Sequence, residues 1–327
     1  MLNTENSKIL VSICCITYNH APFIRKALDG FLMQEPPSGV SKDEPWYEIL
    51  IHDDCSTDGT TEIIKAYTAK YPDRIFPLYE MENQYLKVGT SGIDFFNYNR
   101  AHGRYIAYCE GDDYWTDPKK LQKQVEFMDA HPEYSICFHD FENYEVSQKK
   151  MFPSNEKAWY QNSADKSEQG TELKLTDYFH RIGQPLTMLF RVSMFDFDAH
   201  NRYQYYRDTH EIYHLLNAGK GYWLNFVGGL HIMHSGGISS GVGLDQHCWE
   251  EREHIMELYL ANREDRILRA YLIEILLWNH DVYKQENRTA EFYRIIRPYV
   301  KTIPAVMMNV YLTLFKRCIK GLIRINR

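Results

Sequence analysis

The sequence predicts an α/β protein with a doubly wound mixed sheet and a helical C-terminal extension. Two observations carry this prediction. In the N-terminal third, short apolar runs of strand type alternate with segments whose apolar residues recur at helical spacing. From about Gln246 onward, the periodicity is helical. A chain of 327 residues with 44% hydrophobic content can bury one large core and still carry an appendage.

We expect four strands in the N-terminal part, over residues 9–16, 48–51, 75–79 and 105–109. The first is nearly continuous in apolar residues, as strands buried on both faces of a sheet are. A helix should follow it, with Asn19 as the N-cap, and a second helix should follow the second strand and end before Pro72. Residues 146–172 are polar and aperiodic, so a long mobile loop is expected there.

Polar residues follow three of these strands, at the edge where open α/β sheets bind their ligands. They are Thr17, Tyr18 and Asn19 after the first strand, Asp53 and Asp54 after the second, and Glu110, Asp112 and Asp113 after the fourth. The carboxylates of the last group repel one another unless a positive charge lies between them. Mg²⁺ or Mn²⁺ fits, because these ions take hard oxygen ligands from carboxylates and phosphates. For this acidic tetrapeptide alone, a solvated turn is the alternative.

Motifs that are missing from the sequence narrow the function. The chain has neither G-x-G-x-x-G nor G-x-x-x-x-G-K-[ST], so a bound nucleotide would be held by its base and ribose and through a metal ion. The seven cysteines include no C-x-x-C pair, which favours a reducing compartment. We see no secretory signal and no run of about 20 apolar residues. A cytoplasmic protein without a nucleic-acid partner is therefore expected.

Three segments carry a family resemblance: residues 12–34 with the Thr17-Tyr18-Asn19 turn, residues 52–60 (HDDCSTDGT) and residues 103–115 (GRYIAYCEGDDYW). Together they resemble the N-terminal half of family 2 glycosyltransferases with the GT-A fold, of the type that builds bacterial cell-surface polysaccharides. The resemblance implies that the first turn lies in the nucleotide site and that Asp53 and Asp54 contact the base and ribose. It also implies that Glu110 and Asp112 occupy the metal-binding D-x-D positions, with Asp113 beside them. Glutamate replaces the first aspartate of that motif, so Asp112 is the first choice as metal ligand.

Two later segments extend the resemblance. Asp208 stands where a helix N-cap belongs, and capping alone would explain an aspartate there. The resemblance implies that Asp208 is the general base, with Glu211 as the reserve candidate. Residues 230–241 (LHIMHSGGISSG) resemble the family's His-Gly-Gly loop, which places His234 near the diphosphate and the metal. A separate metal site formed by His231 and His234 is the alternative.

The function expected from these roles is a metal-dependent, inverting transfer of a sugar. The donor is a nucleoside diphosphate sugar, with a UDP-sugar favoured, and the acceptor is a hydroxyl of a glycan or a lipid-linked molecule. Residues 1–117 would form the nucleotide-sugar half and residues 118–245 the acceptor half of a GT-A domain, followed by a helical region over residues 246–327. A nucleotidyltransferase would need a glycine-rich basic loop, and a processive membrane synthase would need spanning helices and a Q-x-x-R-W motif. A noncatalytic nucleotide-sugar binding protein is the other alternative, against which Asp208 argues.

The C-terminal tail has a distinct charge pattern. Residues 292–327 contain eight Lys or Arg and no acidic residue, in a chain whose net charge is −7. On a helix, the apolar residues of this tail would share one side, and basic residues would share the adjacent one. They are Met308, Tyr311, Leu312, Phe315, Ile319, Leu322 and Ile323 on the first side and Lys316, Arg317, Lys320 and Arg324 on the second. Such a helix can lie on an anionic membrane surface, and docking on the protein itself or in a dimer is the alternative.

Overall fold

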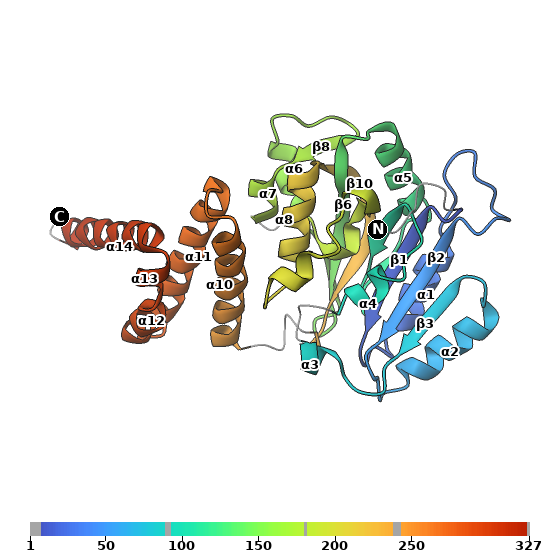
Figure 1. Cartoon of the computed structure of the whole chain (residues 1–327), viewed down its shortest axis with the longest axis horizontal. Coiled ribbons are helices and arrows are strands. Elements are labelled where there is room, and N and C mark those ends of the chain that lie inside the picture. Colours follow the sequence, from blue (N-terminus) through green and yellow to red (C-terminus); the bar gives the residue numbers. More distant parts are fainter. Residues whose placement is uncertain (1–7, 89–92, 180–181, 238–242, 326–327) are drawn as a thin grey trace. The chain divides into compact units, whose positions relative to one another are not determined.

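The computed structural model describes residues 8–88, 93–179, 182–237 and 243–325. The chain divides into two compact units, residues 1–241 and residues 242–327, which are taken separately below (Figure 1).

A ten-stranded mixed sheet forms the centre of the first unit, with the strand order β3-β2-β1-β4-β9-β6-β10-β5 and with β7 and β8 paired to β6 and β10. Neighbours among β3, β2, β1 and β4 run parallel, while β9 is antiparallel to both β4 and β6. The arrangement confirms the mixed α/β fold class. The strands are β1 (Val11–Thr17), β2 (Tyr47–Asp53), β3 (Ile75–Tyr79), β4 (Tyr105–Tyr108), β5 (Tyr114–Trp115), β6 (Tyr134–Glu145), β7 (Lys150–Pro153), β8 (Gly170–Leu173), β9 (Leu189–Arg191) and β10 (Lys220–Met233).

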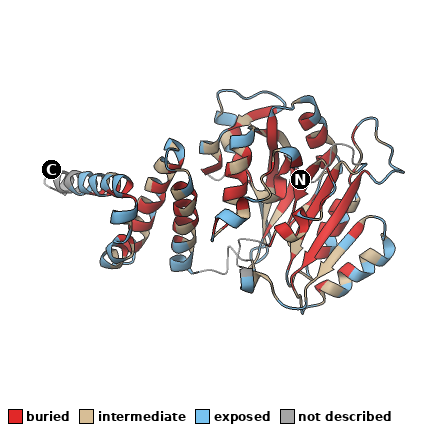
Figure 2. Ribbon diagram, viewed as in Figure 1, coloured by how far each residue is buried: buried red, intermediate tan, exposed pale blue. Residues whose placement is uncertain are grey.

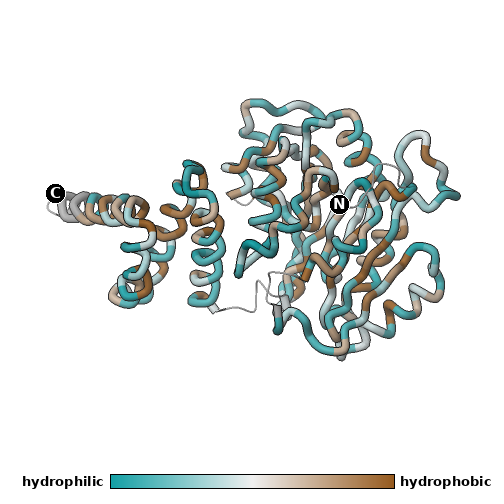
Figure 3. The backbone as a smooth tube through the Cα atoms, viewed as in Figure 1, coloured by the Kyte–Doolittle hydropathy of each residue, from teal (hydrophilic) through white to brown (hydrophobic). Residues whose placement is uncertain are grey.

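Helices cover this sheet, so the central strands are buried along nearly their whole length, as Figure 2 shows. The core joins Val11, Ile13 and Cys15 of β1 to apolar side chains of the first helix. Figure 3 shows the same strands as hydrophobic stretches. The helices of this unit are α1 (Ile24–Leu32), α2 (Thr60–Lys70), α3 (Tyr85–Val88), α4 (Phe95–Tyr98), α5 (Lys120–Ala130), α6 (Glu156–Asn162), α7 (Leu175–Phe179) and α8 (Asp208–Ala218), with 3-10 turns at Pro185–Thr187, Val192–Met194 and Ala199–Arg202.

The strand register decides which loops meet. Thr17, the last residue of β1, stands opposite Asp53, the last residue of β2. On the other side of β1, Cys14 pairs with Tyr108 at the end of β4. The chain then turns through residues 109–113 into β5, which pairs antiparallel with β10. The acidic turn is therefore held between the end of β1 and the C-terminal part of β10.

Two local expectations were wrong. Asn19 caps no helix, because α1 begins only at Ile24 and its N-cap residue is Phe23. The segment 146–172 is not one long loop, since it holds β7, α6 and β8. Its order comes from distant partners: the buried carboxylate of Glu156 accepts hydrogen bonds from the Trp223 indole at 2.6 Å and from the Gly183 backbone at 2.8 Å.

The second unit is helical. Apolar side chains of α10 and α11 form its core, and α14 packs against α11. Among the residues that the structure describes, no helix is long and apolar enough to cross a membrane. The helices are α10 (Leu244–Ala261), α11 (Arg266–Gln285), α12 (Thr289–Ile296), α13 (Tyr299–Thr302) and α14 (Pro304–Ile325).

Candidate active site

Asn19 ties the loop after β1 to the loop after β2. It adopts a left-handed backbone conformation with φ 55°, which asparagine tolerates better than most residues. Its side-chain oxygen accepts the backbone N–H of Thr57 at 2.8 Å, and its own N–H is donated to the Ser56 hydroxyl at 2.9 Å. Asp58 accepts the N–H of Ala21 at 2.9 Å. The turn at residues 17–19 is thus fixed beside Asp53, and Tyr18 remains exposed.

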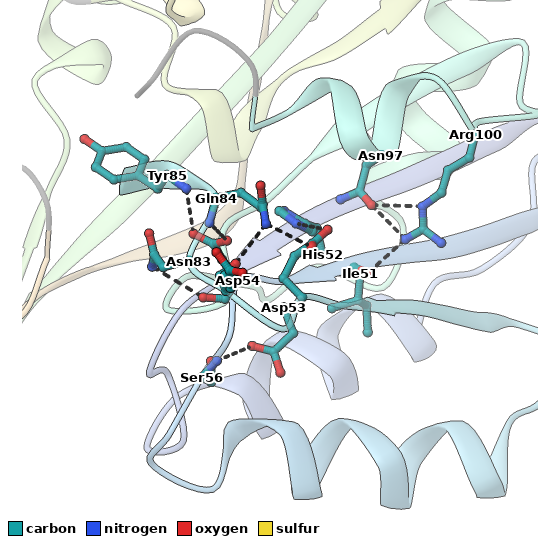
Figure 4. A network of polar contacts seen from close by, with 12 residues as sticks. Ile51, His52, Asp53, Asp54, Ser56, Asn83, Gln84, Tyr85, Asn97 and Arg100 are labelled. Carbon is teal, nitrogen blue, oxygen red and sulfur yellow. Dashed lines mark hydrogen bonds and ion pairs between the residues drawn. The ribbon is translucent and has the colours of Figure 1, made fainter. Parts of the chain in front are cut away.

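Asp53 and Asp54 are almost fully buried, and their carboxylates organise the surrounding loops (Figure 4). Asp53 accepts the backbone N–H of Ser56 at 3.2 Å and also binds the Thr61 hydroxyl. Asp54 accepts two backbone N–H groups at the start of α3, at 2.5 and 3.0 Å. A carboxylate pair offers about four acceptor sites per residue. Both residues therefore fix the loops that follow β2 and precede α3.

Gly111 places the acidic turn. Its N–H is donated to the Ile16 carbonyl at 2.9 Å, which binds the turn to the end of β1. A Cβ atom at this position would lie 2.6 Å from the Thr17 hydroxyl oxygen and 3.1 Å from Nδ1 of His20. Only glycine lets the two backbones approach so closely. Thr17 and His20 therefore lie directly against the acidic turn.

The three carboxylates of the acidic turn differ in environment. Asp113 is buried and accepts the backbone N–H of Ile232 on β10 at 2.8 Å, and burial raises its pKa well above the usual value. Burial and then the charge of Asp112 raise the pKa of Glu110 to about 8. Burial opposes ionisation of Asp112 as well, but the hydrogen bond with His234 and the nearby His20 lower its pKa overall. Asp112 is thus the carboxylate most readily ionised.

Two histidines converge on one oxygen of Asp112. His234 Nε2 lies 3.1 Å from Oδ2, and His20 Nε2 lies 3.5 Å from the same atom. Because Nδ1 of His234 accepts the N–H of Gly236 at 3.2 Å, its Nε2 carries the proton and donates it to Asp112. The other oxygen, Oδ1, is buried and makes no hydrogen bond within the described part of the chain. That oxygen is available to a cation.

Asp208 is the first residue of α8 and is half-buried. The Tyr178 hydroxyl donates to its Oδ2 at 3.4 Å. Its negative charge contributes to the raised pKa of Glu110, so the predicted base and the acidic turn lie within electrostatic reach of each other.

Glu211, the reserve candidate, is fully buried and accepts a hydrogen bond from Tyr98 at 3.1 Å. Burial raises the pKa of Glu211 well above its usual value, and its carboxyl group lies in the core.

Two site residues were missed by the sequence reasoning. Burial raises the pKa of Asp94 to about 7, and its Oδ1 has no hydrogen-bond partner among the described residues. Its charge adds to the raised pKa of Glu110, which places it at the same site. His20 directly follows the Thr17-Tyr18-Asn19 turn, and this position was the available signal. Asp94 precedes α4 without a recognisable motif. His231 has its Nδ1 3.0 Å from the side-chain oxygen of Asn143, and burial lowers its pKa while the charge of Asp112 opposes this shift.

The carboxylate oxygens of the acidic turn are ligands of the kind that divalent cations prefer. The acidic turn supplies hard carboxylate oxygens, one of them buried without a partner, and Asp94 and Asp208 add negative charge. Within residues 8–88, 93–179, 182–237 and 243–325, no group of three or more His, Cys, Asp or Glu side chains is arranged to hold a metal ion unaided.

The sheet therefore brings together polar side chains that follow β1 and carboxyl groups that follow β2 and β4. The profile described as glycosyl transferase family 2 matches residues 12–196, more than half of the chain. The protein therefore belongs to glycosyltransferase family 2.

Curated relatives match mainly in the N-terminal part. An uncharacterised protein of Mycobacterium tuberculosis is 45% identical over 129 residues, 39% of this chain and 34% of that protein. The putative teichuronic acid biosynthesis glycosyltransferase TuaG of Bacillus subtilis is 37% identical over 38% of this chain and 43% of its own length. The Escherichia coli UDP-Glc:alpha-D-GlcNAc-diphosphoundecaprenol beta-1,3-glucosyltransferase WfaP is 33% identical over 42% of this chain and 47% of its own. The chain thus matches between a third and a half of the length of these relatives.

Solved structures share the fold over most of the chain. Staphylococcus aureus TarS 1-349 in complex with UDP-GlcNAc superposes with a TM-score of 0.63 at 18% identity, covering 96% of this chain and 92% of that one. Mannosyltransferase PcManGT of Pyrobaculum calidifontis, in complex with GDP-Man and Mn²⁺, gives a TM-score of 0.54 at 15% identity, covering 94% and 81%. At these identities the likeness establishes the GT-A type fold.

Proposed function

We propose that the protein is a metal-dependent, inverting glycosyltransferase that moves a sugar from a UDP-sugar to a hydroxyl group of a lipid-linked glycan in cell-surface polysaccharide synthesis. The single observation that carries this proposal is the placement of Asp112, with one free buried oxygen, in the same acidic site as Asp208. The reaction would take place at the cytoplasmic face of the membrane. TuaG and WfaP, by their names, act in related syntheses, and the WfaP acceptor is a diphosphoundecaprenol-linked sugar.

In this proposal the donor lies along the carboxyl ends of β1, β2 and β4. Thr17, Tyr18 and Asn19 line one side of the nucleotide, and Asp53 and Asp54 accept hydrogen bonds from its base and ribose. Because the protein's own N–H groups already hold both carboxylates, their oxygens are fixed before the ligand arrives. Fixed acceptors lose little conformational entropy when they bind.

Asp112 is the proposed metal ligand, with Glu110 completing the D-x-D pair. The bound cation would offset the charge that develops on the leaving diphosphate. Asp113 keeps the turn against β10 through the N–H of Ile232. His234 donates to Asp112 and so orients its free oxygen, while a direct bond from His234 Nε2 to the metal would require that hydrogen bond to be given up.

Asp208 is the proposed general base. It would take the proton from the acceptor hydroxyl as that oxygen attacks the anomeric carbon, while the bond to the diphosphate oxygen breaks on the opposite side. One in-line displacement inverts the configuration at the anomeric carbon. In this reading, residues 1–117 serve the nucleotide sugar, residues 118–245 serve the acceptor, and residues 246–327 are a helical appendage.

A thermal-shift screen of UDP-, GDP- and dTDP-sugars, with and without Mn²⁺, tests the donor class. We expect stabilisation by a UDP-sugar that is several-fold stronger with Mn²⁺, and no such gain for an Asp112→Asn variant. Transfer to a synthetic diphosphate-linked lipid acceptor, with the anomeric product read by NMR, then tests the inverting outcome. Equal stabilisation with and without metal, or retention at the anomeric carbon, would contradict the proposal.

A further inference from the structure

Helix α14 has two apolar sides. In the part of the helix whose side chains the structure describes, one side is buried and the other is exposed. Its buried side chains are Val306, Met307, Val310 and Leu314, at positions that share the side of the helix packed against α11. Four other apolar side chains of α14 are exposed. These are Met308, Tyr311, Leu312 and Phe315, with exposed fractions of 61%, 37%, 47% and 64%.

The exposed four are spaced at i, i+3, i+4 and i+7, so they form one continuous line along the helix. We call this line the outer stripe. At 100° per residue, its centre lies well over 90° from the buried side. A continuous exposed apolar surface promotes aggregation unless a partner covers it, so such a surface often marks an interaction site.

The segment that carries the outer stripe has only basic charged residues of its own. Residues 292–327 contain eight Lys or Arg and no acidic residue. Leaving these eight out of the chain's 37 basic residues gives 29 basic against 44 acidic residues in the remainder, a net charge of −15. Lys316 is exposed next to the stripe, and Arg317 pairs at 2.8 Å with Asp281 of α11, on the packed side. The exposed basic side chains Arg294, Arg297 and Lys301 belong to the preceding turns.

Tyr311 of the outer stripe stacks with Tyr293 of α12. The rings of Tyr293 and Tyr311 lie 6.3 Å apart with an interplanar angle of 23°. Both rings are more than a third exposed. Tyrosine is enriched where a protein meets the boundary between lipid headgroups and hydrocarbon, because its ring is apolar and its hydroxyl is polar.

From these observations we propose that the outer stripe docks on an anionic membrane surface, with Met308, Leu312 and Phe315 inserted at the headgroup boundary and the basic side chains paired with lipid phosphates. The inference rests on the proposed function, because a lipid-linked acceptor is presented at such a surface. An amphipathic helix with an apolar line and basic flanks lies in the plane of the interface, with its apolar face buried by about 5–10 Å.

The charge pattern favours lipid over a second copy of the chain. A two-fold symmetric contact brings the same surface of both copies together. Since residues 292–327 carry no acidic group, two stripes in contact would set basic flank against basic flank. The headgroups of an anionic membrane supply the missing negative charge.

Vesicle binding of the full-length protein tests this proposal. The probes are vesicles of phosphatidylcholine with 30–40% phosphatidylglycerol, roughly the anionic content at which polybasic segments bind measurably, and vesicles of phosphatidylcholine alone. We expect binding to the anionic vesicles that weakens steeply between low salt and about 0.5 M salt, where the Debye length falls to roughly 4 Å. The double variant L312E/F315E should bind at least about tenfold more weakly, because it removes two inserted apolar side chains and adds two negative charges.

The matched control is the double variant F76E/I267E. It adds the same two charges at apolar positions that are each 40% exposed and lie on β3 and α11, outside the stripe. All four substituted side chains are exposed, so both variants should melt within a few degrees of the wild type. We expect the control to bind vesicles as the wild type does. Absence of wild-type binding to anionic vesicles, or equal binding by both double variants, would overturn the proposal.

Two further measurements distinguish membrane docking from dimer formation and from a failure of the proposed function. Light scattering measures the oligomeric state: a wild-type dimer that L312E/F315E dissolves, without any vesicle binding, would assign the stripe to a second copy and overturn the membrane proposal. Calorimetric binding of UDP with Mn²⁺ reports on the proposed catalytic site and should be the same in wild type and both variants. Loss of UDP binding in all three proteins with vesicle binding intact would refute the proposed function and leave the membrane surface supported.

Discussion

Asp112 and His234 are 122 positions apart in the sequence, and their side chains meet at 3.1 Å. The antiparallel pairing of β5 with β10 makes this contact, because it draws the acidic turn toward the end of β10. His234 is hydrogen-bonded to Oδ2 of Asp112. The buried Oδ1 of Asp112 has no hydrogen-bond partner among the described residues. This relationship leads to the first expectation.

Asp112→Asn should abolish nearly all transfer and the Mn²⁺-dependent part of nucleotide binding. The change removes one negative charge and replaces an oxygen with a nitrogen that cannot ligate a hard cation. The fold should survive, since Asn still accepts a hydrogen bond from His234. Turnover, calorimetric UDP binding with Mn²⁺ and the melting temperature check this. Asp73→Asn, at an exposed position, is the control, and activity near wild type at saturating Mn²⁺ would refute the role of Asp112.

Asp208→Asn should lower kcat by on the order of 10²–10⁴-fold and change donor affinity little, as removal of a general base does. Asn can keep the hydrogen bond from Tyr178, so α8 should begin at the same residue. Steady-state kinetics over a range of donor concentrations separate kcat from KM. A large rise in KM with unchanged kcat would assign Asp208 to binding instead.

Glu211→Gln should retain transfer at neutral pH and change the pH dependence of stability. Burial raises the folded-state pKa of Glu211 well above 4.5, so its contribution to stability is complete below about pH 4.5 and is lost as the pH rises toward the folded pKa. Glutamine mimics the protonated carboxyl and can accept the hydrogen bond from Tyr98. The melting temperature of the variant should therefore rise relative to that of the wild type as the pH increases above about 4.5. A constant difference would show that Glu211 is ionised in the fold.

Gly111→Ala should damage the site and destabilise the first unit by about 1–3 kcal/mol, the usual cost of overpacking. The new methyl group would lie 2.6 Å from the Thr17 hydroxyl oxygen, which has no room to retreat in the buried end of β1. Gly243→Ala is the matched control, because a Cβ atom there meets nothing within 4 Å. Urea unfolding and transfer assays on both variants check the expectation. Equal stability of the two variants would show that the turn can move away from β1.

The sequence by itself determined the strands and the residues at their ends. Apolar runs such as Val11–Thr17 form strands because they can be buried on both faces, and the acids that follow them fall at one edge of a parallel sheet. That logic located Asp53, Asp54, Glu110 and Asp112 from local pattern alone. It misjudged Asn19 because its hydrogen bonds reach the loop after β2 rather than its own helix.

Only the tertiary structure decided what each polar side chain faces. The pairing of β10 with β5 turned Asp113 toward a backbone N–H and Asp112 toward two histidines, although the two carboxylates are adjacent in sequence. Burial made Glu211 a core residue while Asp208, three positions earlier, stayed half-exposed. The physical reason is that desolvation and hydrogen bonding depend on which segments meet in space, and contacts across more than a hundred residues leave no local periodicity to read.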